Sequence, residues 1–357
     1  MPYQKKNSLS TDERYMLRCL EIAKNGLGTT APNPMVGAVI VHNGKIIGEG
    51  YTSPFGGPHA EVNAIDSVDD TSLLSNACLY VTLEPCSHYG KTPPCADLIV
   101  KHKIPRVVIG LRDPHEKVAG KGIQKLLQAN CEVVTGVLEE NCAAHHKRFL
   151  TFHLKKRPFI ILKWAQTIDG FIAPGKERRA ANPEPYWITT AASRQWVHKW
   201  RSEEQGILVG TTTVLEDNPR LDVRSWTGKS PVRIVIDTSL KITDDYHVLD
   251  GSQKTIVFTR KTDTPADTAS IRCEVLRSEN IAQEICDALY RLQLQSIIIE
   301  GGTQTLQTFI DTNLWDEARV FTGVVSFENG VSAPVIKGRI LSQQTIQNDQ
   351  LTVLKND

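Results

Sequence analysis

Residues 79–86 read Leu-Tyr-Val-Thr-Leu-Glu-Pro-Cys, an apolar stretch that ends in a proline and a cysteine. Its aliphatic, β-branched and aromatic side chains, bounded by the proline, predict a buried β-strand. Cys86 follows the C-terminal end of that strand, and in open α/β sheets ligands bind beyond the strand C-termini. The stretch therefore predicts an α/β sheet that presents Cys86 at a functional edge.

Strand and helix patterns alternate on both sides of this stretch. Ser10 and Glu13 form a capping box in front of an apolar helical face, and Asn43-Gly44 is typical of a hairpin turn. Pro94 is placed to begin a helix. We predict strands at 36–41, 79–83, 107–109 and 132–134, and helices at 59–65, 95–101, 122–129 and 139–150. This alternation predicts a sheet with helices on both faces.

A second α/β run follows a short basic segment, His153 to Pro158, which ends in proline and marks a domain boundary. We predict strands at 159–164, 207–209, 232–236, 255–258 and 296–299, and amphipathic helices at 191–201 and 282–292. The sequence thus predicts two domains, residues 1–152 and residues 153–357.

A histidine and two cysteines give the first domain a candidate metal site. His59 lies in the sequence Pro-His-Ala-Glu, and Cys86 and Cys95 each follow a proline. One histidine and two cysteines can hold zinc tetrahedrally and leave its fourth position for water. Zinc lowers the pKa of that water from about 15.7 to near 7, and Glu61, two residues after the histidine, can carry its proton. This is the chemistry of hydrolytic deamination at a heterocyclic carbon.

Other interpretations of these residues stay open at this point. A lone buried cysteine is usually a small core side chain, and the gap between Cys86 and Cys95 is longer than the usual Cys-x-x-Cys of zinc deaminases. A structural zinc domain would need a fourth protein ligand, for which His88 is available, but it would give Glu61 no role. A nucleoside or nucleic-acid deaminase with an unrelated appendage is a further alternative.

The composition limits the class of protein. The chain has 357 residues, of which 40% are hydrophobic, and a formal net charge of +1. This balance indicates real cores and implies no polyanionic partner, so we expect no nucleic-acid binding. No apolar run approaches the length of a membrane span, and the N-terminus lacks a signal-peptide core. The eight cysteines are spread along the chain, as in a cytoplasmic enzyme and unlike a disulfide-rich secreted domain.

The second domain offers weaker signals. Glu300-Gly301-Gly302-Thr303 ends an apolar strand, and paired glycines allow a phosphate to approach backbone N–H groups at a helix N-terminus. Glycine there also serves an ordinary strand-to-helix turn. The segments 163–170 and 217–219 are further candidates, although each is also typical of a turn.

Taken together, these segments resemble the bifunctional deaminase/reductase family of riboflavin biosynthesis over nearly the whole chain. In the first domain the resemblance lies in residues 32–37, 58–61 and 81–95, which include the long spacing between the two cysteines. In the second domain it lies in residues 163–170, 187–189, 233–237 and 300–302.

The resemblance implies a cytidine-deaminase-like α/β/α domain followed by a dihydrofolate-reductase-like α/β domain. The first would use zinc to deaminate 2,5-diamino-6-(5-phosphoribosylamino)pyrimidin-4(3H)-one. The second would use NADPH to reduce the ribosyl group of the product to a ribityl chain. The family also implies a homodimer formed mainly through the reductase domain.

The resemblance implies roles for individual residues as well. The zinc ligands would be His59, Cys86 and Cys95. Glu61 would carry protons, Asn33 would contact the pyrimidine, and Lys91 would contact the substrate phosphate. The positions that match NADPH-binding residues are Ala165, Trp187, Thr213, Asp217, Thr238, Gly302 and Thr303. The positions that match residues for the reductase substrate are Arg201, Leu221, Arg224 and Glu300, with Lys163 as a further candidate.

The chain departs from the family pattern at a few positions. Thr52 stands where the family often has histidine, His115 where it often has asparagine, and Pro185 where it usually has serine. The segment 171–186 is also longer than usual. These changes bear on substrate contacts and on one wall of the reductase pocket, whereas the zinc core is intact.

Overall fold

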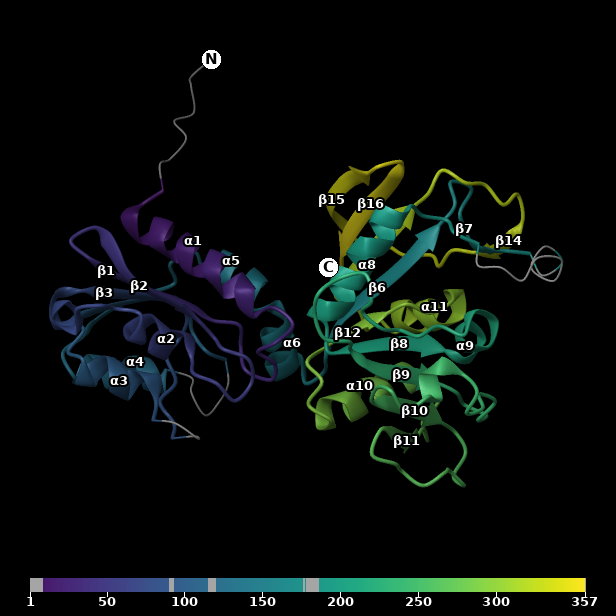
Figure 1. The fold of residues 1–357 in the computed structure, drawn as a ribbon, viewed down its shortest axis with the longest axis horizontal. Helices are drawn as coiled ribbons and strands as arrows, with labels where there is room; N and C mark the ends of the chain where they lie inside the picture. Colours follow the sequence, from purple (N-terminus) through teal and green to yellow (C-terminus); the bar gives the residue numbers. More distant parts are fainter. Residues whose placement is uncertain (1–8, 90–92, 115–119, 176, 178–185, 357) are drawn as a thin grey trace, which may run out of the picture. The chain divides into compact units, whose positions relative to one another are not determined.

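The computed structural model describes residues 9–89, 93–114, 120–175, 177 and 186–356. The chain folds into two compact units, residues 1–155 and residues 156–357, which Figure 1 draws as ribbons. The domain boundary expected between residues 152 and 153 falls inside helix α6 (Lys147–Lys155), which closes the first unit.

A five-stranded sheet forms the centre of the first unit, in the order β2-β1-β3-β4-β5. Its strands are β1 (Gly37–His42), β2 (Lys45–Tyr51), β3 (Cys78–Leu83), β4 (Arg106–Leu111) and β5 (Glu132–Thr135). β3, β4 and β5 run parallel, whereas β1 is antiparallel to both of its neighbours. The predicted turn at Asn43 and Gly44 joins β1 to β2, and its two residues have positive φ angles of 48° and 75°, as such a hairpin turn requires.

Helices cover both faces of this sheet, as predicted. The helices are α1 (Thr11–Ala23), α2 (Ala60–Asp66), α3 (Cys95–Lys101), α4 (Lys121–Gln128), α5 (Glu139–His145) and α6, with short 3-10 helices at Lys24–Gly26 and Thr71–Asn76. Ser10 caps α1 through the predicted capping box with Glu13. Figure 1 shows α1 and α5 over one face of the sheet and α2, α3 and α4 over the other.

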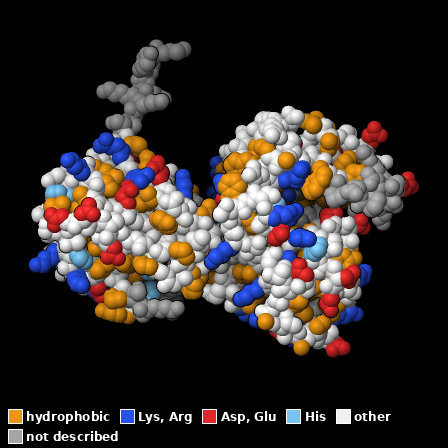
Figure 2. Space-filling view, in the orientation of Figure 1, with side chains coloured by type: hydrophobic (Ala, Val, Ile, Leu, Met, Phe, Trp, Pro, Cys, Tyr) orange, Lys and Arg blue, Asp and Glu red, His pale blue; other side chains and the backbone are white. Residues whose placement is uncertain are grey.

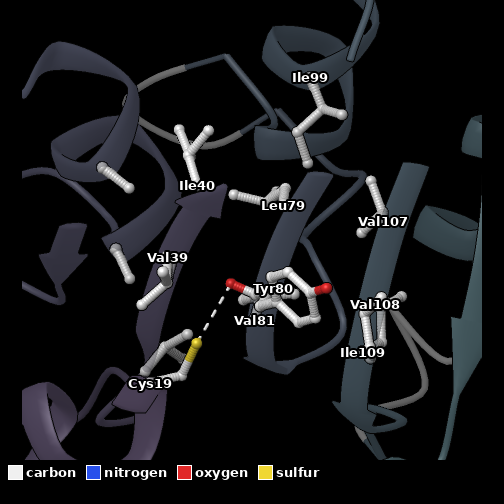
Figure 3. Packing of buried hydrophobic residues seen from close by; sticks show 14 of the residues in the cluster. Cys19, Val39, Ile40, Leu79, Tyr80, Val81, Ile99, Val107, Val108 and Ile109 are labelled. Atoms are coloured by element: carbon white, nitrogen blue, oxygen red, sulfur yellow. Dashed lines mark hydrogen bonds between the residues drawn. The ribbon is translucent and has the colours of Figure 1, made fainter. Parts of the chain in front are cut away.

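Apolar side chains of the strands pack against these helices on both faces (Figure 3). On one face of β3, Leu79 packs toward Ile99 of α3. On the other face lies Cys19 of α1, whose thiol donates a hydrogen bond to the carbonyl oxygen of Tyr80 at 3.5 Å. β3 is therefore buried from both sides, which explains why its sequence is apolar without alternation.

The structure differs from the prediction at the end of this unit. The sequence predicts one helix over 139–150, but the structure has two, α5 and α6, with a break at His146. At the break, Nε2 of His145 lies 2.8 Å from the carbonyl oxygen of Met35, and Nε2 of the buried His146 lies 3.1 Å from Oγ1 of Thr82. The helical period does not reveal this break, because the two rings bind polar atoms that are distant in the sequence.

A nine-stranded sheet forms the centre of the second unit, in the order β11-β10-β9-β8-β12-β6-β13-β16-β15. Its strands are β6 (Phe159–Gln166), β8 (Gly206–Gly210), β9 (Val232–Ile236), β10 (Thr255–Thr259), β11 (Ile271–Val275), β12 (Ser296–Ile299), β13 (Glu317–Thr322), β15 (Arg339–Ile346) and β16 (Asp349–Lys355). The run from β11 to β13 in this order is parallel, and β16 and β15 extend it antiparallel. A separate pair joins β7 (Phe171–Pro174) to β14 (Gly330–Ser332).

The sequence prediction misses the strands at the C-terminal side of this sheet. β13 carries two charged residues that are nevertheless buried, because Arg319 donates a hydrogen bond from Nε to Glu317 at 2.7 Å. β15 is exposed along nearly its whole length and so lacks an apolar signature. β7, β11, β14 and β16 are the other strands without a sequence prediction.

Helices also cover both faces of the larger sheet. They are α8 (Ala191–Glu203), α9 (Thr211–Asp217), α10 (Ile281–Arg291) and α11 (Thr303–Asp311), with a short 3-10 helix at His247–Leu249. Ile160 of β6 packs in one apolar cluster with α10 and α11, and its neighbour Ile161 packs in another with α8 and α9. Within the described part of the chain, we find no helix that combines the length and the apolar character needed to cross a bilayer.

A buried ion pair joins the start of β6 to the start of β13. Arg157 donates two hydrogen bonds to the carboxylate of Asp316, at 2.5 and 2.9 Å, and both side chains are 8% exposed. The same carboxylate accepts a hydrogen bond from the backbone N–H of Ile160 at 2.9 Å. Loss of Asp316 would leave the Arg157 guanidinium buried without this carboxylate, which is strongly destabilising.

We therefore expect Asp316→Ala to lower the free energy of unfolding of the second unit by about 3–5 kcal/mol. Tryptophan fluorescence during urea denaturation reports on this unit, because all six tryptophans lie within it. Glu279→Ala is the matched control, since it removes the carboxylate partner of Arg260 from an ion pair at the surface and should hardly move the midpoint. Equal losses in the two variants would contradict the assigned role of the buried pair.

Candidate active sites

His59, Cys86 and Cys95 lie together although they come from three segments. His59 is the N-cap of α2, Cys86 follows β3, and Cys95 is the first residue of α3. Nδ1 of His59 lies 3.7 Å from Sγ of Cys86 and 3.3 Å from Sγ of Cys95, and the three ligand atoms lie within 4.8 Å of one another. Zinc bonds of about 2.0 Å to nitrogen and 2.3 Å to sulfur place tetrahedral ligand atoms roughly 3.5 Å apart, so this donor set fits zinc.

Backbone hydrogen bonds from the start of α3 hold Cys86 beside Cys95. The backbone N–H of Cys95 donates to Sγ of Cys86 at 3.3 Å, and the N–H of Ala96 donates to the carbonyl oxygen of Cys86 at 3.1 Å. Hydrogen bonding from Cys95 lowers the pKa of the Cys86 thiol, and His59 lowers it further against the effect of burial. This favours the thiolate, which is the form that binds metals.

The cluster has the composition of an open metal site. Among the residues that the structure describes, the group consists of His59, Cys86 and Cys95. His88, the candidate for a fourth ligand of a closed structural site, is exposed and does not belong to it. Three protein ligands leave a position for water, as in catalytic zinc sites.

Glu61 lies in the first turn of α2 and is only 4% exposed. Burial raises the pKa of its carboxyl to about 7, and the charge of Cys86 raises it as well, while His59 acts in the opposite direction. A carboxyl with a pKa near 7 can both accept and release a proton at neutral pH. The helix thus places a candidate proton carrier two residues after a candidate metal ligand.

Glu84 supports this site and escapes the sequence analysis. Its buried carboxylate accepts hydrogen bonds from four backbone N–H groups, those of Asp113, Gly120, Gly122 and Ile123, at 3.0 to 3.3 Å. A Cβ on Gly122 would stand 2.1 Å from the carbonyl oxygen of Pro85. Only glycine at this position therefore lets the start of α4 lie this close to Pro85. Glu84 therefore fixes α4 against the residues that lead into Cys86. A glutamate between an apolar strand and Pro-Cys is the signal that could have identified it.

The loop that carries Asn33 is tied to the strand that follows it. The N–H of Asn33 donates to the carbonyl oxygen of Thr30 at 2.9 Å. The N–H of Val36 donates to Oγ1 of Thr52 at 3.1 Å, and the N–H of Thr52 donates back to the carbonyl oxygen of Val36 at 3.0 Å. Thr52, which departs from the family pattern, is thus a buried anchor of this loop. Three other residues singled out from the sequence lie outside the described residues: Lys91, His115 and Pro185.

In the second unit, Lys163, Arg201 and Glu300 form a charged cluster whose side chains are 15%, 14% and 7% exposed. Lys163 comes from β6 and Arg201 from α8, and Glu300 follows β12. Arg201 donates from Nε and Nη2 to the two carboxylate oxygens of Glu300, both at 2.9 Å, and Nζ of Lys163 donates at 3.2 Å. Burial would raise the pKa of Glu300, but the positive charges of Arg201 and Lys163 outweigh it and lower the pKa to about 2. The ionised carboxylate therefore fixes both cationic side chains.

The segment 220–224 lies against Arg201. Nη1 of Arg201 donates to the carbonyl oxygen of Asp222 at 3.3 Å, and the Asp222 carboxylate accepts from Nη1 of Arg224 at 2.5 Å. Leu221 is 2% exposed and has a φ of 53°, a conformation that leucine rarely adopts. Arg201 thus links the charged cluster to the segment that carries Leu221 and Arg224.

The glycine pair lies at the N-terminus of α11, beside α9. Gly302 caps α11, and its N–H donates to Oγ1 of Thr213 at 3.1 Å. The hydroxyl of Thr303 donates to the carbonyl oxygen of Ser332. A Cβ on Gly301 would come within 2.7 Å of the Thr305 side chain. Backbone N–H groups at a helix N-terminus can bind phosphate, so this turn is a candidate phosphate site.

The other residues expected to bind the cofactor lie on separate elements of the second unit. Ala165 is in β6, Asp217 ends α9, and Thr238 follows β9. Trp187 is 60% exposed, and the guanidinium of Arg194 lies over its ring at 4.3 Å. Ala165 is two residues from Lys163 on the same strand, which places it on the same face of the sheet as the charged cluster.

Two family models match the chain, one in each unit. Residues 9–111 match the cytidine and deoxycytidylate deaminase zinc-binding region, and residues 158–328 match the RibD C-terminal domain. The riboflavin biosynthesis protein RibD of Aquifex aeolicus is 39% identical over 326 residues, which cover 90% of this chain and 89% of the relative. The protein of the same name from Bacillus amyloliquefaciens is 38% identical over 354 residues, which cover 97% and 90%.

Solved structures of related proteins also match the chain, over nearly its whole length. A diaminohydroxyphosphoribosylaminopyrimidine deaminase/5-amino-6-(5-phosphoribosylamino)uracil reductase from Thermotoga maritima is 35% identical, with a TM-score of 0.88 over 97% of this chain and 99% of the other. RibD from Acinetobacter baumannii, in its form 1, is 29% identical, with a TM-score of 0.87 over 97% and 99%. The similarity therefore extends over both units.

The geometry of the metal centre leads to a prediction about zinc content. Cys86→Ser removes a thiolate ligand, and we expect zinc affinity to fall about a hundredfold or more, beyond the range for loss of a supporting hydrogen bond. Plasma mass spectrometry of protein dialysed against a weak chelator measures the zinc retained. Cys273→Ser, at a half-buried cysteine of the second unit, should keep the wild-type content. Full zinc retention in Cys86→Ser would remove Cys86 from the ligand set.

Proposed function

Because the chain belongs to the RibD family of riboflavin biosynthesis proteins, we propose that its candidate sites carry two successive reactions. The chain is a bifunctional enzyme with a zinc-dependent deaminase region and an NADPH-dependent reductase domain. The first reaction deaminates the diaminopyrimidinone ribosyl phosphate to a uracil, and the second reduces the ribosyl group to a ribityl chain. The residue roles below are our proposal.

The deaminase site rests on one observation, the convergence of His59, Cys86 and Cys95 beside the buried Glu61. His59, Cys86 and Cys95 would hold zinc. When bound, zinc makes water acidic enough to supply hydroxide near neutral pH. Glu61 would take the proton of that water and return it to the departing amino group, so that one carboxyl serves as base and then as acid.

Two further residues would bind the deaminase substrate. Asn33 would contact the pyrimidine, and its loop is fixed by the paired hydrogen bonds between Val36 and Thr52. An amide side chain can both donate and accept hydrogen bonds, which suits the edge of a substituted pyrimidine. Lys91 would bind the substrate phosphate, and the support for it is the family resemblance of residues 81–95.

In the reductase domain two of the proposed substrate residues, Arg201 and Lys163, donate hydrogen bonds to a third, Glu300. NADPH supplies the hydride. Arg201 and Lys163 are each held by the Glu300 carboxylate, so their remaining N–H donors point in fixed directions toward a ligand. Arg224 and Leu221 would complete the substrate site, since a guanidinium can bind phosphate through two hydrogen bonds.

The proposed NADPH residues come from several elements, and the glycine turn is one of them. Gly302 and Thr303 would bind at the N-terminus of α11, and Thr213 of α9 lies beside them, since its hydroxyl accepts from the N–H of Gly302. The remaining members of this set would be Ala165, Trp187, Asp217 and Thr238. An indole that is largely exposed, as in Trp187, offers an apolar surface to a flat ring.

The alternatives from the sequence have less support. The match of residues 158–328 to the RibD C-terminal domain argues against an unrelated appendage. On the face drawn in Figure 2, the basic side chains of the described residues are interspersed with acidic ones in each unit, whereas nucleic-acid binding calls for a continuous basic surface. We also propose a cytoplasmic location, where a reducing environment keeps the cysteine ligands from forming a disulfide.

The experiment for this function is one incubation with the diaminopyrimidinone ribosyl phosphate, with and without NADPH, followed by mass spectrometry. We expect loss of the amine without NADPH and uptake of hydride once NADPH is added. Glu61→Gln should retain zinc, deaminate about 10²–10⁴-fold more slowly, and still reduce the deaminated uracil supplied directly. Full deamination by Glu61→Gln would overturn the proton-carrier role, and no deamination by the zinc-loaded wild type would overturn the substrate.

We further propose a homodimer in which β15 of the reductase domain contributes to the interface. β15 is the last strand of the nine-stranded sheet, and its Ile340 and Leu341 are 54% and 47% exposed. An unpaired edge with apolar side chains favours pairing with another chain.

Native mass spectrometry should therefore find a dimer of the wild type and a shift to monomer in Ile340→Lys, because a charge would be buried at the contact. Leu127→Lys is the matched control, since Leu127 is equally exposed, at 54%, but lies in the first unit. A dimer that persists in Ile340→Lys would place the interface elsewhere.

A further inference from the structure

The segment 220–224 contains one residue, Leu221, in an unfavourable backbone conformation, and hydrogen bonds hold the segment near both of its ends and at its centre. The buried Arg233 donates from Nε to the carbonyl oxygen of Arg220 at 3.0 Å, and Oγ of Ser230 accepts from the N–H of Val223 at 3.1 Å. Between these two anchors, Leu221 adopts its positive φ of 53°. Such a conformation persists only where the surroundings determine it, so the contacts at the centre of the segment matter.

His198 supplies the central contact. It lies on α8, one helical turn before Arg201, and is 6% exposed. Its Nδ1 lies 3.1 Å from the carbonyl oxygen of Asp222, the same oxygen that accepts from Nη1 of Arg201 at 3.3 Å. Two side chains on one face of α8 therefore form hydrogen bonds with a single carbonyl group next to Leu221.

The chemistry of this contact fixes the state of the imidazole. A carbonyl oxygen can only accept, so Nδ1 of His198 must carry a hydrogen, and the more distant N–H of Arg224, at 3.5 Å, is not its main partner. Burial lowers the pKa of His198, and the charges of Arg201 and Arg224 lower it further. The ring is thus a neutral imidazole with its hydrogen on Nδ1.

We propose that His198 is a positioning residue of the reductase site, which holds the Asp222 carbonyl and thereby presents Leu221 and Arg224 to the phosphorylated substrate. This inference rests on the proposed function of the second unit. His198 itself need not touch the substrate, because its Nδ1 is already hydrogen-bonded to the carbonyl oxygen of Asp222. Its loss should therefore weaken substrate binding and leave the binding of NADPH and the deaminase reaction intact.

Two amide substitutions separate this role from simple packing. The amide nitrogen of asparagine can take the place of Nδ1, whereas that of glutamine reaches the place of Nε2. We expect His198→Gln to raise the KM for the uracil ribosyl phosphate about tenfold, the effect of one lost hydrogen bond, with kcat and the KM for NADPH nearly unchanged. His198→Asn should stay near the wild-type KM, because it restores the donor.

Several outcomes would overturn the proposal. Wild-type KM in both variants, or equal losses in both, would show that the Nδ1 donor does not position the segment. Equal loss of NADPH affinity would indicate a general structural role. Deamination by the same preparations serves as the internal control, since its residues lie in the other unit.

A second measurement does not depend on the stability of any variant. Nitrogen-15 NMR of the wild-type imidazole side chains distinguishes the two neutral tautomers, and we expect the Nδ1–H form for His198, identified by the signal missing from His198→Asn. An Nε2–H tautomer would overturn the proposal. Absence of any reduction by the wild type would instead overturn the proposed function, and the NMR result would stand separately.

Discussion

Each unit depends on a buried carboxylate that stands one residue beyond the end of its middle strand. Glu84 follows β3, and Glu300 follows β12. In both cases the backbone N–H donates to a carbonyl oxygen of the neighbouring strand at 2.9 Å, so the residue is fixed as part of the sheet. A buried carboxylate must be compensated by hydrogen bonds or opposite charge. The groups that gather for this purpose form the surroundings of the two sites.

The two units compensate their carboxylates in different ways, and the difference suits their chemistry. Within the described part of the chain, Glu84 accepts from backbone N–H groups alone, so it does not engage the side chains of His59, Cys86 and Cys95, the candidate metal ligands. Glu300 is neutralised by Arg201 and Lys163, whose charges can also meet a phosphorylated substrate. In the first unit the Glu84 carboxylate therefore holds backbone segments near the candidate metal site. In the second unit the Glu300 carboxylate orients the cationic side chains of Arg201 and Lys163.

Positions that depart from the family pattern or break the helical period take part in holding loops. Thr52 anchors the loop after Asn33 through Val36, and the break at His146 lets two histidines bind Met35 and Thr82. These contacts join residues that are far apart in the sequence. In each case a polar side chain contributes a hydrogen bond to a backbone or hydroxyl group of a distant segment.

The sequence by itself determined the α/β class, the first sheet and most helices, because apolar periodicity, the capping box at Ser10 and the turn at Asn43-Gly44 are local signals. It also predicted that His59, Cys86 and Cys95 form a metal site with Glu61 nearby, and the structure brings the three candidate ligands within 4.8 Å of one another. Only the tertiary structure decided the roles of Glu84 and His198 and the existence of β13, β15 and β16. Buried polar residues of this kind are stabilised by partners from distant segments, and an exposed edge strand is stabilised by pairing with its neighbour, so neither leaves a pattern along the chain.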